Sequence, residues 1–422
     1  MKTKQKVIVI GAGFAGLNFV KQLSEDDFEI LLIDKVNHHQ FQPLFYQVAT
    51  SQIEPASISF PLRHILRKKK NLQIRLAEVY SINENPNEIH TSIGVFSYDL
   101  LVLAIGCKTN FFGNNNIAKH ALTLKSTYDA IEIRNHVLEN FETILSSSLE
   151  EKKNRLNLAI VGAGPTGVEL AGAFAEIKKH ILPKDYPGID FSEFKIYLIE
   201  GSAHTLNSMS ENAKINSKKY LQDMGVELIT ETFVKNYDGI SLELSNGQTL
   251  NCKTLIWAAG VIGNTLEGLP KESITNGNRI IVDRYNKVNH CKHIYAIGDI
   301  ALMHTPLYPK GHPQLANVAI NQAINLAKNL NRLLKNKEQV AYEYKDLGSM
   351  ATIGRNKAVV DLPKIKFKGF FAWLVWMFLH LMLILSVKNK LIIFINWTWA
   401  YFSKNSALRL ILKSKTPKAL QA

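Results

Sequence analysis

Near its start the chain carries Lys6-Val7-Ile8-Val9-Ile10-Gly11-Ala12-Gly13-Phe14-Ala15-Gly16. The Val and Ile run predicts a buried parallel strand, and glycines at the first, third and sixth places of the next six predict a tight turn into a helix. A second strand, 29–33, ends at Asp34. Such a turn holds a pyrophosphate at the helix N-terminus, and the acid holds a ribose hydroxyl. The alternative is an ordinary glycine turn, but strand, helix and acid in register favour a dinucleotide site.

Length and cysteine content narrow the class of protein. A chain of 422 residues has room for two or three domains. Cys107, Cys252 and Cys291 lie far apart, so neither a disulfide framework, a metal site nor a redox disulfide is predicted. We expect a reducing compartment. We also expect no cleaved targeting peptide, because the first strand begins at residue 6.

The distribution of charge indicates a membrane partner. The net charge is +14, and residues 341–422 hold 13 Lys and Arg against three acids, so +10 of the excess lies there. This part of the chain is also the most apolar. No stacking or groove-reading motif is present, so an anionic membrane surface is favoured and nucleic acid is not.

A polar-aromatic run, 38–47, follows the first unit. It is expected either to line a flat ring system or to form a surface loop. Further on, a short helix is predicted at 59–67, strands at 72–83 and 88–96, and a buried strand at 100–106. That last strand ends in Ala104-Ile105-Gly106.

A second copy of the opening pattern follows a helix predicted from the capping box at Ser126 to about residue 149. It spans 158–167, with glycines at Gly162, Gly164 and Gly167, and the next strand, 195–199, ends at Glu200. The interval from Gly162 to Glu200 is 38 residues, and we assign the excess to an inserted loop at 183–188. Two copies predict two dinucleotides.

Three later segments complete the predicted units. Strands at 225–229 and 240–244 lead to Ala258-Ala259-Gly260, which parallels the turn at 104–106. A strand at 293–297 ends in Gly298-Asp299, where the acid can bond a cofactor's polyol or simply cap a turn. Apolar spacing predicts a helix over 313–334.

The C-terminal region predicts a membrane anchor. Residues 369–387 carry no formal charge, and a helix of that length spans about 28 Å. The run 391–402 holds Trp and Tyr, which favour the headgroup level. The tail places four cations, Arg409, Lys413, Lys415 and Lys418, among apolar residues, as on an anionic surface. Interfacial anchoring is favoured over a membrane span or a buried dimer helix.

Two dinucleotide sites predict a flavin and a nicotinamide on one chain. No Arg follows Glu200 in Gly201-Ser202-Ala203 to receive a 2′-phosphate, so NADH is favoured over NADPH. The chain has no cysteine pair to take electrons from the flavin. A direct acceptor is therefore needed, and the membrane tail indicates a lipid-soluble quinone.

The chain resembles the type II NADH:quinone oxidoreductases from residue 6 to about 402, most specifically in 41–50, 162–176, 295–299 and 350–358. The resemblance implies an α/β fold of two Rossmann-like dinucleotide-binding domains, with a C-terminal membrane-docking helical segment. It also implies a homodimer, peripheral (monotopic) on the cytoplasmic face of the inner or plasma membrane. The expected boundaries are 1–115 and 266–362 for the FAD-binding domain, 116–265 for the NADH-binding domain and 363–422 for the anchor.

The resemblance assigns site residues by matching position. The residues expected to bind FAD are Gly11, Gly13, Phe14, Ala15, Gly16, Asp34, Lys35, Gln42, Val79, Ala104, Gly106 and Asp299. Those expected to bind NADH are Gly162, Gly164, Thr166, Gly167, Glu200 and Gly260. Glu169 matches an acidic residue between nicotinamide and isoalloxazine that orients hydride transfer or relays protons; its alternative is a Glu that complements the helix dipole.

The sequence departs from the family at one motif. Where the family usually has two glutamines, this chain has Asn317 and Asn321, four residues apart on one helical face. The resemblance places this motif at the quinone head, so both are expected catalytic residues. Menaquinone and ubiquinone remain open as substrates.

Two other classes compete with this assignment. A sulfide:quinone reductase shares the fold but needs catalytic cysteines that this chain does not place in its pattern. A flavoprotein that binds NADH and signals by interaction, without quinone turnover, would be consistent with the altered motif.

Overall fold

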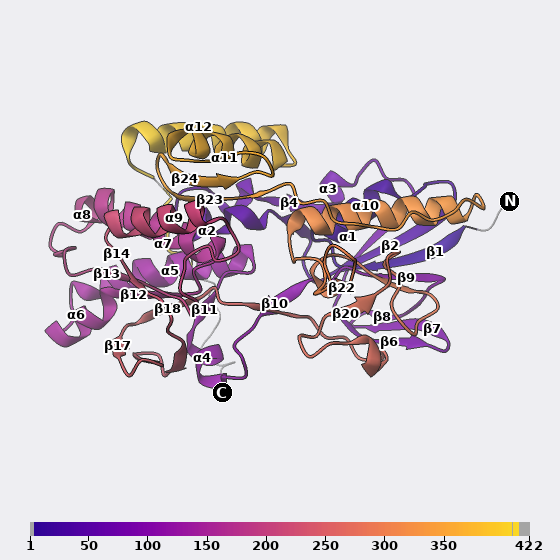
Figure 1. The fold of residues 1–422 in the computed structure, drawn as a ribbon, viewed down its shortest axis with the longest axis horizontal. Helices are drawn as coiled ribbons and strands as arrows, with labels where there is room; N and C mark the ends of the chain where they lie inside the picture. Colours follow the sequence, from indigo (N-terminus) through magenta and orange to yellow (C-terminus); the bar gives the residue numbers. More distant parts are fainter. Residues whose placement is uncertain (1–3, 407, 413–422) are drawn as a thin grey trace. The chain divides into compact units, whose positions relative to one another are not determined.

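The computed structural model describes residues 4–406 and 408–412 (Figure 1). The chain forms two compact units. Unit 1 comprises residues 1–40, 59–108 and 261–345, and unit 2 comprises residues 41–58, 109–260 and 346–422. Both units are discontinuous in sequence, so each is built from segments far apart in the chain.

Unit 1 is built on a five-stranded parallel sheet in the order β21-β9-β1-β2-β5. Side chains alternate between its faces: Val7 and Val9 of β1 pack toward α1 and α10, while Ile8 and Ile10 pack on the opposite side. Both faces are covered, which explains the continuous Val and Ile run. The strands are β1 Gln5–Ile10, β2 Phe28–Asp34, β5 Leu72–Leu76, β9 Leu100–Leu103 and β21 Ile294–Ala296.

Helices and smaller sheets cover this core. The helices α1 and α10 pack side by side on one face (Figure 1). The helices are α1 Phe14–Gln22, α3 Leu62–Ile65 and α10 Ala316–Leu333, with 3₁₀ turns η3 Lys271–Ser273 and η4 Gly298–Ile300. The remaining strands are β3 His38–Gln40, β4 Ser59–Pro61, β6 Val79–Glu84, β7 Asn87–Thr91, β8 Gly94–Ser97, β19 Val261–Gly263, β20 Ile280–Val282 and β22 Ala301–Met303. The strand β10 Cys107–Thr109 begins in unit 1, and its last residue belongs to unit 2.

Unit 2 repeats the arrangement with a second parallel sheet, ordered β11-β18-β12-β13-β14. Its strands are β11 Leu122–Thr123, β12 Asn157–Val161, β13 Lys195–Ile199, β14 Val226–Ile229 and β18 Thr254–Trp257. Its helices are α2 Phe45–Ala49, α4 Asn115–His120, α5 Thr127–Ile144, α6 Leu149–Arg155, α7 Pro165–His180, α8 Leu182–Asp185 and α9 Glu211–Asp223, with 3₁₀ turns η1 Gln42–Leu44 and η2 Pro55–Ser57. An antiparallel sheet joins β15 Val234–Tyr237, β16 Ser241–Leu244 and β17 Thr249–Asn251.

The C-terminal part of unit 2 is a three-stranded antiparallel sheet covered by two helices (Figure 1). Its strands are β23 Ser349–Gly354, β24 Lys357–Asp361 and β25 Lys366–Lys368, and its helices are α11 Phe370–Leu383 and α12 Val387–Ser403. The helix α11 packs on β24, burying Ala372 and Trp376, and α12 buries Ile393 and Trp397. Each helix therefore buries only a narrow stripe.

The predicted uninterrupted helix over 369–387 is wrong. The helix α11 ends at Leu383, because Ile384 turns to extended backbone with φ −64° and ψ +132°. The next helix begins at Val387, four residues earlier than the predicted run at 391. Within the part of the chain that the structure describes, no helix is long and apolar enough to cross a bilayer.

Arg409, expected at an anionic surface, has a partner within unit 2. Its guanidinium forms an ion pair with Asp185 of α8, and its contact with a membrane stays a prediction. Leu412 donates its N–H to the side chain of Asn135 on α5, so the segment after α12 packs on unit 2. Lys413, Lys415 and Lys418 lie outside the described residues.

Several predicted helices and strands are divided, or begin and end at other residues, in the structure. Residues 59–67 form β4 and a short α3, and 72–83 and 88–96 each divide into two strands. Ser126 caps α5 by accepting the N–H of Asp129, as predicted, but that helix ends at Ile144. The predicted helix over 313–334 is observed as α10, beginning three residues later.

Candidate functional site

In unit 1 the glycine turn between β1 and α1 leaves space at its middle glycine. Gly11 has φ +99°, and a Cβ there would lie 2.4 Å from the carbonyl oxygen of Ala104. A Cβ on Gly16 would lie 1.9 Å from the carbonyl oxygen of Gly11. For Gly13, in contrast, no described atom beyond its chain neighbours would lie within 4 Å of a Cβ. A pyrophosphate can therefore approach the backbone at Gly13, beside the N-terminus of α1.

Asp34, at the end of β2, is oriented toward this turn by backbone donors. Its Oδ2 accepts the N–H of Ala12 at 2.6 Å, and its Oδ1 accepts the N–H of Val36 at 2.9 Å. Burial raises the pKa of Asp34, while these donors and His38 lower it. The carboxylate is thus held beside the glycine turn, as a ribose-binding acid requires.

Asp299 lies next to the same turn. A Cβ on its neighbour Gly298 would lie 3.0 Å from Cβ of Ala15 on α1, and the N–H of Gly298 donates to Gln322 of α10. Arg279 donates to the carbonyl oxygen of Asp299 at 3.2 Å. The strand end that carries Asp299 is therefore fixed between α1 and α10.

The structure groups the other expected FAD residues only in part. Ala104, directly after β9, lies beside Gly11, and Gly106 follows two residues later. Phe14 packs edge-on against His39 at a ring distance of 5.1 Å. Val79 begins β6. Lys35 forms an exposed ion pair with Glu78, and Gln42 belongs to unit 2. For all of the expected FAD residues, contact with the cofactor stays a prediction.

Unit 2 contains a matching glycine turn between β12 and α7. Gly162 also has φ +99°, and a Cβ there would lie 2.8 Å from the carbonyl of Ala258. A Cβ on Gly167 would lie 1.8 Å from the carbonyl oxygen of Gly162. Gly164 borders open space, and Thr166 next to it is exposed.

Glu200 takes the place that Asp34 has in unit 1. Its Oε2 accepts the N–H of Ala163 at 2.7 Å, and its Oε1 accepts the N–H of Ser202 at 2.8 Å. The residue that follows Glu200 is tightly packed, since a Cβ on Gly201 would lie 2.4 Å from the ring of Phe233. Gly260, with φ +78°, lies beyond β18 and beside Phe112.

Glu169 is buried one turn into α7. The helix begins at Pro165, so Glu169 lies beyond the first turn, where the dipole effect is strongest. Its Oε1 accepts the N–H of Thr352 on β23 at 3.4 Å, which does not favour the dipole explanation. Burial raises the pKa of Glu169 to about 8, against the lowering effects of Thr352 and the indole of Trp376. At neutral pH this carboxyl is mostly protonated.

Glu169 lines a cavity of about 110 Å³ within unit 2, called here the Glu169 cavity. Its walls come from α2, α7, β23, α11 and α12. Trp376 and Trp397 form part of its aromatic wall, and Arg355 and Lys404 add positive charge. The cavity therefore combines one neutral acid with an aromatic wall, the Arg355–Glu176 ion pair and the cation of Lys404.

Gln47 is a functional candidate that sequence reasoning did not single out. Its Nε2 donates to the hydroxyl of Tyr46 at 2.9 Å, and its Oε1 accepts the indole N–H of Trp397 at 2.8 Å. These residues are buried, so the surface-loop alternative for residues 38–47 is wrong for the part that forms α2. The signal for this residue in the sequence was its place as a glutamine within an aromatic run.

Asn317 and Asn321 lie on one face of α10, as predicted. The Nδ2 of Asn321 donates to the carbonyl oxygen of Asn317 at 2.9 Å and to its Oδ1 at 2.6 Å. Neither residue is part of the wall of the Glu169 cavity. The structure brings the two amides together, and their contact with quinone stays a prediction.

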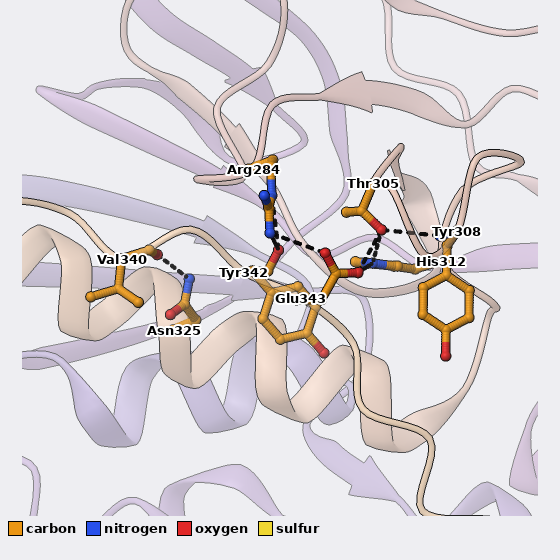
Figure 2. A network of polar contacts seen from close by, with 8 residues as sticks. All are labelled: Arg284, Thr305, Tyr308, His312, Asn325, Val340, Tyr342 and Glu343. Atoms are coloured by element: carbon orange, nitrogen blue, oxygen red, sulfur yellow. Dashed lines mark hydrogen bonds and ion pairs between the residues drawn. The ribbon is translucent and has the colours of Figure 1, made fainter.

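A polar network in unit 1 fixes the segment that leads into α10 (Figure 2). Glu343 accepts from Thr305 at 2.6 Å and from Arg284 at 3.0 Å. The buried His312 lies 3.3 Å from the hydroxyl of Thr305, and burial lowers its pKa. This network anchors both flanks of α10, because Asn325 of the helix also donates to the carbonyl of Val340.

None of the three cysteines forms a disulfide in the described part of the chain, and their surroundings differ. Burial raises the pKa of Cys252 and of Cys291 to about 12, so both remain thiols at neutral pH. Cys107 accepts a hydrogen bond from Gln314 at 2.9 Å. None is placed as half of a redox pair in the described part of the chain.

Two known families together match nearly the whole chain. Residues 5–323 match the pyridine nucleotide-disulphide oxidoreductase family, and residues 347–404 match the NDH2 C-terminal domain. The structure is similar to NDH2 of Plasmodium falciparum, solved in complex with NADH, with a TM-score of 0.89, 24% identity and coverage of 97% of this chain and 100% of that chain. The sulfide:quinone oxidoreductase of Aquifex aeolicus matches with a TM-score of 0.71 and 20% identity over 95% of this chain and 96% of that chain, which shows a shared fold.

Sequence relatives agree with these matches. The chain is 33% identical over 419 residues to the type II NADH:quinone oxidoreductase NdhA of Mycobacterium tuberculosis, covering 95% of this chain and 88% of the relative. It is 30% identical to the type II NADH:quinone oxidoreductase of Staphylococcus aureus, covering 84% and 89%. The predicted fold class, enzyme class and cofactor pair, FAD and NADH, are confirmed. By its identity to these relatives and its match to both family domains, the chain belongs to the type II NADH:quinone oxidoreductases.

Proposed function

We propose that this chain is a membrane-associated flavoenzyme that passes two electrons from NADH through FAD to a membrane quinone without pumping protons. The observation that carries the proposal is the doubled glycine turn, since each unit has its own open glycine and its own backbone-oriented acid. The sequence has no cysteine pair to take electrons from the flavin. A direct acceptor follows from these two facts together.

Unit 1 is proposed to hold FAD, and its residues fit the group. The open backbone at Gly13 admits the pyrophosphate, Asp34 accepts a ribose hydroxyl, and Asp299 bonds the ribityl chain. When bound, FAD supplies hydride acceptance from NADH and electron delivery to quinone. The protein's part is to place the ring, with Gly298 keeping the strand end close to α1.

Unit 2 is proposed to hold NADH. The open backbone at Gly164 admits the pyrophosphate, and the carboxylate of Glu200 accepts from the adenine ribose hydroxyls. A 2′-phosphate would meet this carboxylate with no Arg in residues 201–203 to offset it. NADH is therefore preferred to NADPH.

Glu169 is proposed to hold a proton for quinone reduction. Its carboxyl is protonated at neutral pH because burial raises its pKa to about 8. The N–H of Thr352 and the indole of Trp376 stabilise its charged form after the proton leaves. Asn317 and Asn321 are proposed to contact the quinone head, and the substrate is menaquinone or ubiquinone.

The helices α11 and α12 are proposed to dock on an anionic membrane from the cytoplasmic side, in a homodimer. Most of their large apolar side chains are exposed, including Phe371 at 74% and Phe402 at 78%. Lys388 and Lys404 are exposed beside them, and Lys390 is half-buried. An apolar surface flanked by cations favours the interface of an anionic bilayer.

Vesicle experiments test this function. Purified protein added to anionic vesicles with a quinone analogue is expected to oxidise NADH and reduce the quinone with no change in lumenal pH. The triple variant Phe371→Ser, Phe378→Ser and Phe402→Ser is expected to lose vesicle flotation. A matched control changes three exposed apolar residues of unit 1: Leu76→Ser, Tyr80→Ser and Val95→Ser. Unchanged flotation of the first triple variant, or lumenal acidification, would contradict the proposal.

A further inference from the structure

Arg134 of α5 is a buried cation without a partner. Only 2% of its surface is exposed, and its Nε and Nη2 have no hydrogen-bond partner among the described residues. No carboxylate within residues 4–406 and 408–412 forms an ion pair with it. Because an arginine side chain stays protonated in proteins, this guanidinium is a full positive charge removed from water.

Among the described residues, Arg409 lies beside Arg134 and already has its own carboxylate partner. The segment after α12 packs on α5 through the bonds of Leu412 to Asn135, and it brings Arg409. The carboxylate of Asp185 is paired with Arg409. No Asp or Glu follows Asp361 in the sequence, so no acidic side chain of the C-terminal part can reach Arg134. Buried charges are normally paired, and no described carboxylate pairs with Arg134, which favours an anion from outside the chain.

A small cavity beside Arg134, called here the Arg134 cavity, provides the space. Its volume is about 20 Å³, and it is lined by Arg134, Arg409, and Thr50 and Ser51 at the end of α2, with apolar residues of α5 and α7. A cavity of this size holds about one water-sized particle. Phosphate, sulfate and lipid headgroups are too large, whereas a single-atom anion fits.

A water molecule alone does not satisfy this site. Buried waters occupy positions with two to four polar partners, and most of this wall is apolar. The hydroxyl of Thr50 already donates to the carbonyl of Tyr46. A neutral water would also leave the charge of Arg134 uncompensated.

We propose that Arg134 binds a small monovalent anion of chloride size in the Arg134 cavity. The ion would accept from Nε and Nη2 of Arg134 and neutralise its charge, since Arg409 is already paired with Asp185. The site joins α5 to the end of α2, the helix that carries Tyr46 and Gln47 to the Glu169 cavity. Anion binding is therefore expected to stabilise unit 2, independently of the electron acceptor.

Thermal unfolding of the FAD-loaded full chain tests the proposal. Chloride is titrated against gluconate at constant ionic strength. Because a ligand of the folded state stabilises it in proportion to the logarithm of its concentration above Kd, the wild type is expected to gain about 2–4 °C in Tm with chloride or bromide. Gluconate is too large to enter. The variant Arg134→Met keeps the side-chain volume without the charge and is expected to show no difference between the anions.

Two further measurements make the test decisive. Arg67→Met removes an exposed arginine of unit 1 and is expected to keep the full chloride shift. If Arg134→Met does not fold, wild-type crystals in bromide are expected to show an anomalous peak within hydrogen-bond distance of Nε and Nη2 of Arg134. Equal Tm in chloride and gluconate, a chloride shift that survives in Arg134→Met, or no bromide peak at Arg134 would overturn the proposal.

Discussion

The two glycine turns have nearly the same backbone conformation but are held by different contacts. Gly11 and Gly162 share φ +99°, and the acids Asp34 and Glu200 both accept the N–H of the residue after the first glycine. In unit 1 a ring nitrogen of His39 contacts the carbonyl of Ala12 at 3.0 Å, whereas in unit 2 the backbone N–H of Leu206 donates to the carbonyl of Ala163 at 2.8 Å.

The shared backbone of the two turns and their different surroundings bear on different properties of the sites. Glycine spacing determines the phosphate-binding backbone, so both turns fit a pyrophosphate equally well. We propose that the surroundings determine which nucleotide each turn holds. In unit 1, Gly298 of η4 packs against α1 and α10 beside the turn. In unit 2, Gly201, which follows the acid, packs against the ring of Phe233. Variants that change one turn at a time can separate these contributions.

The largest expected effects come from the middle glycines. Gly13→Val is expected to give colourless protein without FAD, because its side chain fills the space for the pyrophosphate. Gly164→Val is expected to stay yellow, with flavin bleaching by NADH slowed about a hundredfold or more, since about 3 kcal/mol of lost binding has that effect. Absorbance and stopped-flow measurements check both.

Gly188→Val provides the control for these two variants. Gly188 is an exposed loop glycine in unit 2 that also borders open space. It is expected to behave as the wild type. Rapid bleaching of Gly164→Val would remove this turn from the NADH site.

A smaller effect is expected at the acid of unit 2. Glu200→Gln replaces a charged acceptor with an amide that cannot satisfy both backbone donors, so the KM for NADH is expected to rise about tenfold with kcat nearly unchanged. Discrimination against NADPH is expected to weaken. Steady-state kinetics with both nucleotides measure this, with Glu243→Gln on the exposed side of β16 as the control. An unchanged NADPH-to-NADH ratio would contradict the assignment.

The double variant Asn317→Leu and Asn321→Leu is expected to raise the quinone KM several-fold, while NADH still bleaches the flavin rapidly. Removing both amides removes the hydrogen bonds proposed for the quinone head. Asn325→Leu, two turns beyond Asn317, is the control, because Asn329 also donates to the carbonyl that Asn325 contacts. Unaltered quinone kinetics in the double variant would exclude these residues from the site.

The smallest expected effect is a change in pH dependence at Glu169. Since its pKa is about 8, quinone reduction is expected to fall as pH rises through that value, and Glu169→Gln is expected to lack this limb. Between its ordinary value of 4.5 and about 8, the unfolded chain has lost this proton and the folded chain has not. Stability is therefore expected to fall with rising pH in that window, and Gln removes the slope. A pH–rate profile of Glu169→Gln identical to that of the wild type would contradict the proton-holding role.

The turns were predictable from sequence because their chemistry is local. Glycine spacing, a preceding Val and Ile run and an acid at the end of the next strand define each turn within about 40 residues. The shared face of Asn317 and Asn321 follows from helical spacing alone. These features need no knowledge of distant contacts.

Other features depend on partners far along the chain. Gln47 meets Trp397, and Glu169 meets Thr352 and Trp376, across separations that periodicity does not report. The break after Leu383 allows α11 to lie on β24, so hydropathy alone predicted too long a helix. The ion pair of Arg409 with Asp185 likewise joins residues far apart in the sequence.

Electron flow is tested most directly by one stopped-flow sequence on the purified, oxygen-free protein. NADH is added until the flavin bleaches, and then a quinone analogue is added. The account predicts that flavin colour returns at once, with one quinone reduced per NADH oxidised and no effect of thiol-blocking reagents. A flavin that stays bleached in the presence of quinone, or recolouring that thiol blocking abolishes, would contradict direct transfer.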